Sequence, residues 1–374
     1  MTDLPPSAPR AACDDLLDPN DSDPARRAEL LDWLRVQAAL GLRPGHACRA
    51  LGEGASAGAL WHSADAEGRA RAAALQIDGR VWRSLIRHEV RLLPWTSPRY
   101  PERLRRLSDA PPLLAVQGDV AAFERPCLSI VGARASTTYG RRTARALAAE
   151  VASAGVCVIS GLARGVDAAA HLGALDVGGV TVAVQARGPD DIYPAAHREL
   201  GGRIRTSGAL LSEFAPGMEP RRPFFPLRNR IISALADAVW IVEARMRSGS
   251  LVTARHAADQ GVDVLALPGP VGAPTSEGTN ALLRDGARIV LDSEDLLDAL
   301  GVETSAVPVP DSRSPVERAG SAVLAALGHE PATRDELGRR LSLAPELLAL
   351  ELAELEIAGA IESDRDGRLR PRRR

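Results

Sequence analysis

The stretch from Leu128 to Leu175 constrains the fold of this chain more than any other part of its sequence. It begins with a short, β-branched apolar run, continues through a loop of glycine and hydroxylated residues, and then shows a helical pattern. From Val156 onward the same three parts repeat. Two such units in tandem predict a parallel α/β sheet with both glycine loops at the carboxyl ends of their strands. Ligands of such sheets bind at that edge, where backbone N–H groups and helix dipoles favour phosphate.

Strands and helices continue to alternate on either side of this stretch. Because the apolar runs are short and helical patterns separate them, the sequence predicts an α/β fold with a doubly wound parallel sheet. The further predicted strands are 113–116, 180–184, 210–214, 238–242, 262–267 and 288–291.

The chain divides into five predicted parts. Residues 1–27 are rich in Pro and Asp, which is typical of a disordered leader, and 28–95 show helical periodicity with a Pro-Gly turn inside a short helical hairpin. Residues 96–300 hold the predicted sheet, and 301–314 form a linker of Pro, Val and Ser. Residues 315–374 show three helices and a hairpin, which is a winged-helix pattern.

The third helix of the winged-helix pattern is acidic. It carries Glu346, Glu351, Glu354 and Glu356. Carboxylates on the element that would enter a DNA groove repel phosphate, so we expect this module to bind protein or to pack internally.

Composition restricts the site and the compartment. The net charge is −2, so a nucleic-acid site would have to be a local patch, and all 46 basic residues are arginine, a planar and permanently charged donor suited to phosphate. The four cysteines form no CxxC pair, which disfavours a zinc site or a disulfide framework and fits a reducing cytoplasm. The sequence shows no signal-peptide pattern and no apolar run long enough for a membrane, so we expect a cytoplasmic protein without a membrane partner.

Arginines, hydroxyls and aromatic rings follow the predicted strands and are expected to converge on one sheet edge. An arginine groove with aromatic faces suits single-stranded nucleic acid, because phosphates are followed by the arginines while bases stack on the rings. We expect Phe214 and one of Phe224 and Phe225 to be core residues. The predicted DNA-binding residues are Gly132, Arg134, Ser136, Ser160, Gly161, Arg164, Gly165, Arg221, Arg222, Phe225, Arg228, Asn229, Arg230, Ser248, Gly249 and Ser250.

Catalytic and metal signatures are missing from the sequence. No Asp, Glu and His cluster has metal-ligand spacing, and the first predicted loop reads GARASTTYG rather than GxGxxG, which disfavours a nicotinamide cofactor. We interpret Asp167 as a helix N-cap and His171 as a packing residue, because no nucleophile is placed beside it. The sequence therefore predicts no catalytic residue, metal or cofactor.

These motifs together resemble the DNA processing protein A family, DprA, also called Smf. The resemblance extends from about Tyr100 to Leu291. It is carried by Ile130-Val131-Gly132-Ala133-Arg134, Tyr139-Gly140, Ser160 to Asp167, His171 to Leu175, Tyr193-Pro194, Leu211-Ser212-Glu213, Phe225 to Ile232, Ser248 to Ala254 and Pro268-Gly269.

The resemblance implies an extended Rossmann-like domain with a SAM-like helical domain before it and a winged helix after it. It implies a non-enzymatic homodimer that binds single-stranded DNA and loads RecA recombinase onto it during natural transformation or recombination. By position, Gly132 and Arg134 match the family's central DNA-pocket motif. The chain departs from the family at Ala195, where lysine is frequent after Tyr-Pro, and at His197, where asparagine is common. We expect Arg198, Arg221 or Arg222 to supply the missing basic contact.

Two alternatives have different chemistry. Nucleotide phosphoribohydrolases with a PGGxGTxxE signature have a related fold, but here Gly278-Thr279 lies downstream of Pro268-Gly269, and Leu282 replaces the glutamate that would act as acid or base. A protein-interaction scaffold that binds through the acidic terminal helix is the other alternative.

Overall fold

The computed structural model describes residues 16–40, 45–302, 323–324, 326–327, 332–341, 345–357, 360–363 and 368–371. The chain divides into two compact units, Met1–Ser305 and Ala306–Arg374. The first unit contains the sheet and the N-terminal helices, and the second contains the winged-helix segment.

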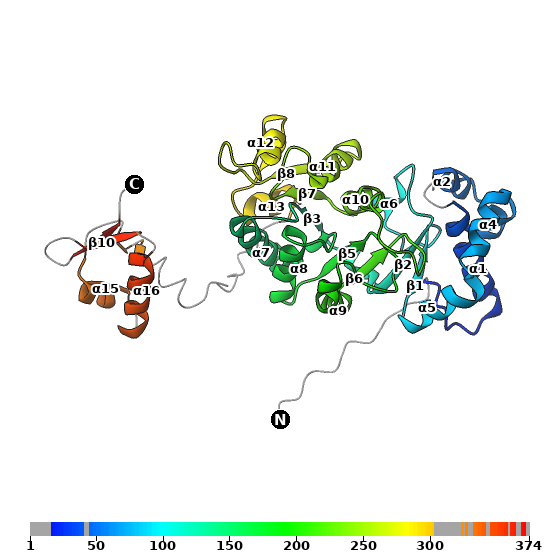
Figure 1. Cartoon of the computed structure of the whole chain (residues 1–374), viewed down its shortest axis with the longest axis horizontal. Helices are drawn as coiled ribbons and strands as arrows, with labels where there is room; N and C mark the ends of the chain where they lie inside the picture. The colour runs from blue at the N-terminus through cyan, green and yellow to red at the C-terminus, as the bar shows by residue number, and fades with distance from the viewer. Residues whose placement is uncertain are drawn as a thin grey trace, which may run out of the picture. The chain divides into compact units, whose positions relative to one another are not determined.

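The first unit is built on a nine-stranded sheet with the order β1-β2-β6-β5-β4-β3-β7-β8-β9 (Figure 1). The strands from β6 to β9 in this order are parallel, whereas β2 is antiparallel to both β6 and β1. The predicted parallel, doubly wound sheet is therefore confirmed, with an antiparallel pair added at one edge. The strands are β1 (Arg91–Pro94), β2 (Leu113–Gly118), β3 (Cys127–Val131), β4 (Cys157–Ser160), β5 (Thr181–Gln185), β6 (Ala209–Ser212), β7 (Ala238–Ile241), β8 (Asp263–Ala266) and β9 (Arg288–Ile289).

The strand order reverses between β3 and β7. From β3 the chain proceeds outward through β4, β5 and β6, then returns to the other side of β3 with β7, β8 and β9. Val131, the last residue of β3, is aligned with Ile241, the last residue of β7. The loops that follow these two strands leave in opposite directions, which opens a crevice at their carboxyl ends.

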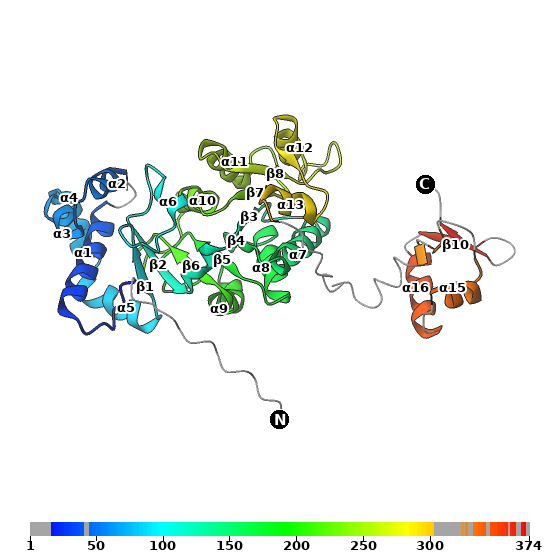
Figure 2. The ribbon, with the colours of Figure 1, turned by 180° about the vertical axis from the view of Figure 1, so that it is seen from behind.

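Helices cover both faces of the sheet (Figures 1 and 2). Every residue of β3 to β7 is buried, which explains why these strands have apolar runs rather than alternating patterns. One face packs on α6 (Glu102–Arg105), α10 (Phe224–Ala234), α11 (Gly249–Asp259) and α12 (Glu277–Arg284). The other face packs on α7 (Thr138–Ser153), α8 (Val166–Asp176), α9 (Arg198–Ser207) and α13 (Ser293–Ala299).

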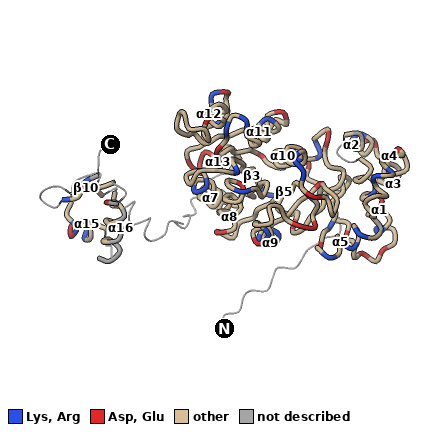
Figure 3. The backbone as a smooth tube through the Cα atoms, viewed as in Figure 1, with Lys and Arg blue, Asp and Glu red and all other residues tan. Residues whose placement is uncertain are grey.

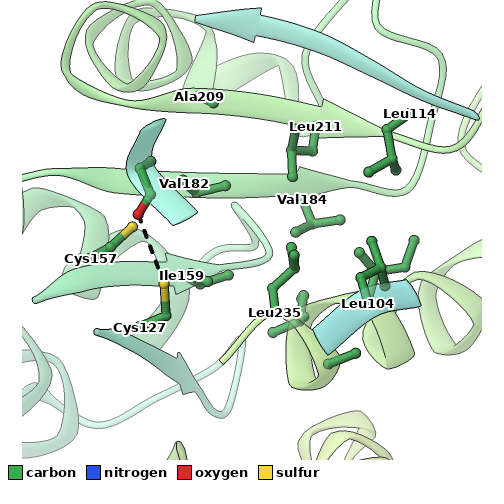
Figure 4. Close-up of a cluster of buried hydrophobic side chains, with 14 of the residues drawn as sticks. Leu104, Leu114, Cys127, Cys157, Ile159, Val182, Val184, Ala209, Leu211 and Leu235 are labelled. Atoms are coloured by element: carbon green, nitrogen blue, oxygen red, sulfur yellow. Dashed lines mark hydrogen bonds between the residues drawn. The ribbon is translucent and has the colours of Figure 1, made fainter. Parts of the chain in front are cut away.

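The core on the α10 face shows how strands and helices meet. Leu114, Val184 and Leu211 come from three neighbouring strands and lie opposite Leu104 of α6 and Leu235 at the end of α10 (Figure 4). All five are buried, so the sheet and these helices form one continuous apolar layer.

The N-terminal helices extend the layer formed by α7, α8 and α9. Their apolar residues share a core with Leu92 of β1 and with Leu113 and Ala115 of β2. The side-chain amide of Gln37 donates to the carbonyl of Glu213 at 2.7 Å, which ties the segment to the loop after β6. The elements are α1 (Pro24–Leu40), α2 (Gly45–Gly52), α3 (Ala57–His62), α4 (Ala66–Ala74), the π-helix η1 (Ile77–Val81) and α5 (Trp82–Arg87).

Two predictions about this segment are wrong in detail. Leu16 and Leu17, placed in the leader, are buried, and Leu17 forms a β-bridge with Leu92. Strand β1 lies inside the predicted helical range 28–95 and belongs to the sheet. Periodicity missed β1 because a four-residue apolar strand is too short to show alternation.

The second unit confirms the later part of the winged-helix pattern. It contains α15 (Arg334–Leu341), α16 (Pro345–Ile357) and the antiparallel strands β10 (Ile361–Ser363) and β11 (Leu369–Pro371). Most of the first predicted helix lies outside the described residues, as does nearly all of the predicted linker. Glu351 is only 3% exposed, so α16 does not present all four predicted carboxylates to solvent, whereas Glu356 is exposed.

Within the described ranges, no helix has both the length and the apolar character required to cross a bilayer.

Candidate nucleic-acid interface

A pocket of about 460 Å³ opens at the carboxyl ends of β3 and β7, where the strand order reverses. Four parts of the chain form it: the loop after β3, the loop after β4 with the first turn of α8, the first turns of α10, and the loop after β7 with the start of α11. The edge expected from the tandem units therefore carries a cavity. The lining residues are Val131–Ala135, Ala163, Asp167, Phe225, Pro226, Arg228, Asn229, Ile232, Arg245, Arg247–Ser250, Val252 and Thr253.

Two buried charged groups lie at the inner end of the pocket. The Asp167 carboxylate accepts hydrogen bonds from the backbone N–H groups of Gly161 at 3.2 Å and Ala163 at 3.3 Å. The Arg228 guanidinium donates to the carbonyl of Gly161 at 2.7 Å and to that of Val184. The predicted N-cap role of Asp167 is wrong, because Gly165 occupies the N-cap position of α8 and Asp167 instead fastens the preceding loop.

Burial shifts the pKa of both groups. It raises the pKa of the Asp167 carboxyl, while the positive charges of Arg228 and Arg134 act against that rise. It lowers the pKa of Arg228 to about 10, which still leaves the guanidinium charged at neutral pH. The lining residues thus include four arginines, Arg134, Arg228, Arg245 and Arg247, and one carboxylic acid, Asp167, which gives a formal charge of 4 − 1 = +3 when that acid is ionised. An excess of positive charge in a concave site attracts anions.

An aromatic pair borders the pocket beside an exposed arginine. The guanidinium carbon of Arg134 lies 4.7 Å from the ring centroid of Phe225, within the range of a cation–π interaction. The Tyr193 ring lies 5.8 Å from the same Phe225 ring. Phe224, the preceding residue, instead stacks on Phe214 in the core at 4.3 Å, so one of the two phenylalanines is a core residue as predicted.

Three glycines among the predicted DNA-binding residues are required by packing. A Cβ at Gly132 would lie 2.6 Å from Val166, and a Cβ at Gly161 would overlap the Arg228 guanidinium. Gly165 has φ +82°, a conformation that side chains disfavour, and a Cβ there would strike the carbonyl of Ala133. Gly132 and Gly165 let the loop after β3 approach the start of α8 closely, and Gly161 leaves room for the Arg228 guanidinium, whichever ligand binds.

The first turn of α11 forms the opposite wall. The Ser248 side chain caps this helix by accepting from the N–H of Ser250, and the two hydroxyls lie 2.6 Å apart. Asn229 donates from Nδ2 to the carbonyl of Gly249 at 3.3 Å, which connects α10 to this wall. Backbone N–H groups at a helix start favour a negatively charged ligand.

The structure brings together half of the predicted residues. Arg230 lies on the opposite side of α10, where it pairs with Glu213 at 2.7 Å and with Asp109 at 2.9 Å. Ser160 is buried and donates to the carbonyl of Ile130 at 2.6 Å. The predicted residues that line the pocket are Gly132, Arg134, Phe225, Arg228, Asn229, Ser248, Gly249 and Ser250; those that do not are Ser136, Ser160, Gly161, Arg164, Gly165, Arg221, Arg222 and Arg230.

Sequence reasoning missed Arg245 and Arg247 as pocket residues. Both follow β7 directly and are exposed in the loop that enters α11. Loops after parallel strands meet at one sheet edge, and Ser248 and Ser250 were predicted as site residues on that ground. The same ground applies to Arg245 and Arg247, which belong to the same loop.

His171 of α8 is a buried neutral residue, as its predicted packing role requires. Its Nδ1 lies 2.7 Å from the Thr181 hydroxyl, which itself donates to the carbonyl of Val158, so Nδ1 carries the proton. Nε2 is buried without a hydrogen-bond partner in the described part of the chain. Burial lowers the pKa of this imidazole to about 3.

This shift predicts a pH-dependent stability. An unfolded chain binds a proton at His171 near pH 6.5, whereas the folded chain does so only near pH 3. Stability contributed by this group is therefore complete above pH 6.5 and is lost by up to about 1.4 kcal/mol per pH unit as the pH falls toward 3. We expect His171→Asn to remove this dependence of the unfolding free energy on pH, measured by urea unfolding from pH 7 to pH 5.

Burial raises the pKa of Asp167 and Glu213, so these carboxyl groups change the unfolding free energy with pH in the opposite direction to His171. The variant must therefore be compared with wild type at each pH. Equal slopes in the two proteins would contradict the prediction.

Comparison with known proteins places the chain in a family. The sequence profile described as DNA recombination-mediator protein A matches residues 91–301, and that of the DprA winged helix domain matches residues 307–367. The chain is 40% identical to Protein Smf of Escherichia coli over 291 residues, which cover 75% of this chain and 78% of that protein.

Two solved structures are similar. DNA processing protein A from Streptococcus pneumoniae superposes with a TM-score of 0.63 at 31% identity, over 71% of this chain and 95% of that one. DNA processing protein A from Helicobacter pylori, described with a single-stranded DNA binding mode, superposes with a TM-score of 0.51 at 32% identity, over 54% of this chain and 92% of that one. The chain belongs to the DNA recombination-mediator protein A family, DprA.

Proposed function

We propose that this chain binds single-stranded DNA in the pocket between β3 and β7 and acts as a recombination mediator rather than an enzyme. The observation that carries the proposal is the position of the arginines and the Phe225 ring at the point where the strand order reverses. Arg134, Arg245 and Arg247 are exposed at the pocket and can bind phosphates, while Phe225 and Tyr193 offer faces for bases. The single-stranded DNA binding described for the Helicobacter pylori relative supports the same ligand.

Binding explains the pocket better than catalysis does. Asp167 is the only carboxylate among the residues that line it, and this side chain is buried and engaged by two backbone N–H groups. Leu282, at the position of the missing phosphoribohydrolase glutamate, packs against the core. A general acid or base must reach the reacting atoms, and neither residue meets this requirement.

Binding is tested by fluorescence anisotropy with a labelled oligo-dT and its duplex at about 50 mM and about 200 mM salt. We expect tighter binding of the single strand, because only its bases can stack on Phe225 and Tyr193. When the logarithm of the binding constant is plotted against the logarithm of the salt concentration, the three exposed arginines of the pocket should contribute about −2 to the slope. Equal affinity for the duplex, or binding that does not respond to salt, would contradict the proposal.

We further propose that the bound strand is passed to RecA recombinase, as the family resemblance implies. The measurement is the single-stranded-DNA-dependent ATPase activity of RecA, with and without this chain. A shorter lag is the expected result. An unchanged lag together with normal DNA binding would limit the function to binding.

Homodimer formation is the third proposal, supported by the outer side of β9. This edge strand has no neighbour on its outer side in the described sheet, and Ile289 and Leu291 are 49% and 67% exposed beside it. An apolar open edge is a ready surface for pairing. We expect Leu291→Glu to reduce the mass measured by sedimentation from dimer to monomer. Val271→Glu, at a position 98% exposed in another loop, is the matched control and should leave the mass unchanged.

A further inference from the structure

A second, basic cleft lies between the N-terminal helices and the sheet. Its volume is about 470 Å³. One wall comes from η1, α5 and the residue that follows, and the other from the loops after β5 and β6. The lining residues are Arg80, Arg83, Ser84, Arg87, His88, Asp190, Pro216 and Gly217.

The three arginines of this cleft share one side of their helical segment. The spacing of Arg80, Arg83 and Arg87 places them on successive turns, while Trp82 and Leu85 are buried. Basic positions lie along the α5 segment (Figure 3). Like charges at this spacing repel one another. None of the three arginines forms an ion pair or a side-chain hydrogen bond with the residues that the structure describes. The arrangement therefore favours an external anion.

The opposite wall offers little compensating negative charge. Asp190 is the only carboxylate among the lining residues, and one of its oxygens already accepts from the N–H of Gly217 at 2.8 Å. Gly217 has φ +85°, and a Cβ there would lie 2.7 Å from Nη2 of Arg80. A glycine at this turn thus lets the Arg80 guanidinium lie against the loop after β6, at the same sheet edge as the pocket between β3 and β7.

One loop connects the two cavities. The segment between β5 and α9 carries Tyr193, whose ring contacts Phe225 at the first pocket, and Asp190, which lines the cleft. Arg187 and Arg198 of this region both bind Asp191, at 2.9 Å each, so they are engaged between the two sites. A chain of phosphates that leaves the first pocket past Tyr193 would reach the cleft along this loop.

We propose that the cleft formed by Arg80, Arg83 and Arg87 binds backbone phosphates of the DNA strand whose other part occupies the first pocket. The N-terminal helical segment is then part of the nucleic-acid interface. This inference rests on the proposed function, because it assigns a continuation of the same strand.

The test compares the variant Arg80→Ala/Arg83→Ala/Arg87→Ala with wild type on two labelled oligo-dT probes, of about 6 and about 20 nucleotides. The long probe can span both sites, and the short one fills only the first. For the long probe we expect at least about tenfold weaker binding and a log–log salt slope smaller by about 2, since each lost phosphate contact removes about 0.7. For the short probe we expect affinity within about twofold of wild type.

The single variants Arg83→Ala and Arg49→Ala provide a matched comparison. Arg49 is an exposed arginine of α2, at the other end of the same helical segment (Figure 1). We expect Arg83→Ala to reduce the salt slope for the long probe and Arg49→Ala to leave it unchanged. All these arginines are exposed, and circular dichroism melting should confirm that the variants remain folded.

The outcomes separate this inference from the proposed function. Suppose that Arg134→Ala weakens the binding of both probes, while the triple variant binds the long probe with wild-type affinity. The cleft is then not a DNA site, and the inference is wrong. If wild type binds neither probe, the proposed function itself fails. An equal loss on the short and long probes would also overturn the inference, because the cleft would then act through the first pocket and not on a continuing strand.

Discussion

Replacing Arg134 with alanine is expected to weaken binding of single-stranded DNA by about 10- to 100-fold. A hydrogen bond to a charged group contributes about 1.5–3 kcal/mol, and Arg134 is the exposed arginine held against the Phe225 ring at 4.7 Å. The substitution removes a phosphate contact and also frees the ring that we assign to base stacking. The measurement is fluorescence anisotropy with labelled oligo-dT, repeated at two salt concentrations.

Two further variants make the Arg134 experiment specific. Arg134→Lys keeps the charge but loses the planar group that stacks on Phe225, so an intermediate affinity is expected. Arg255→Ala removes an exposed arginine of α11 that does not line the pocket, and its affinity should match wild type. Equal losses in Arg134→Ala and Arg255→Ala would show that overall charge, not the pocket, determines binding.

Replacing Arg228 with methionine is expected to destabilise the first unit by about 2–6 kcal/mol, because two buried carbonyls lose their hydrogen-bond donor at a cost of about 1–3 kcal/mol each. Arg228 is buried, donates to two carbonyls from neighbouring strand ends, and its positive charge opposes the burial-driven rise in the pKa of Asp167. Methionine fills similar space but supplies no donor and no charge. Urea unfolding at pH 7 measures the loss.

A double variant distinguishes electrostatics from packing at this position. Combining Arg228→Met with Asp167→Asn removes both charges, so the loss should be clearly smaller than the sum of the two single losses. Simple additivity would mean that Asp167 and Arg228 do not interact. In that case the hydrogen bonds of Arg228 to Gly161 and Val184 would account for its whole effect.

The sheet could be predicted from sequence because its strands are buried on both faces. Short apolar runs such as Leu128–Val131 and Ala238–Ile241, when they lie between helical patterns, indicate strands of a parallel sheet that is covered on both faces. The edge at which the pocket between β3 and β7 opens was also predictable, since the loops after parallel strands meet at their carboxyl ends. The antiparallel β1–β2 pair was harder to predict from the sequence, because its position at the sheet edge depends on contacts of Leu92 and Ala115 with the N-terminal helices.

The individual site residues were harder to predict, for reasons of geometry. Arg228 and Arg230 are two positions apart on α10, so they must point in different directions, and the structure places only Arg228 in the pocket. Helical periodicity could have separated them. No sequence pattern could show that Arg221 and Arg222 lie outside the pocket while Arg245 lies at it, because the paths of these loops depend on tertiary packing.

The most direct test of the central assignment is to photo-crosslink the wild-type protein to an oligo-dT containing 4-thiothymidine and to map the attached peptides by mass spectrometry. The pocket between β3 and β7 predicts crosslinks at Phe225 and Tyr193, which compete with unlabelled single strand and disappear at high salt. Crosslinks confined to residues 306–374, with none on either aromatic residue, would contradict the assignment and would place DNA binding in the winged-helix unit.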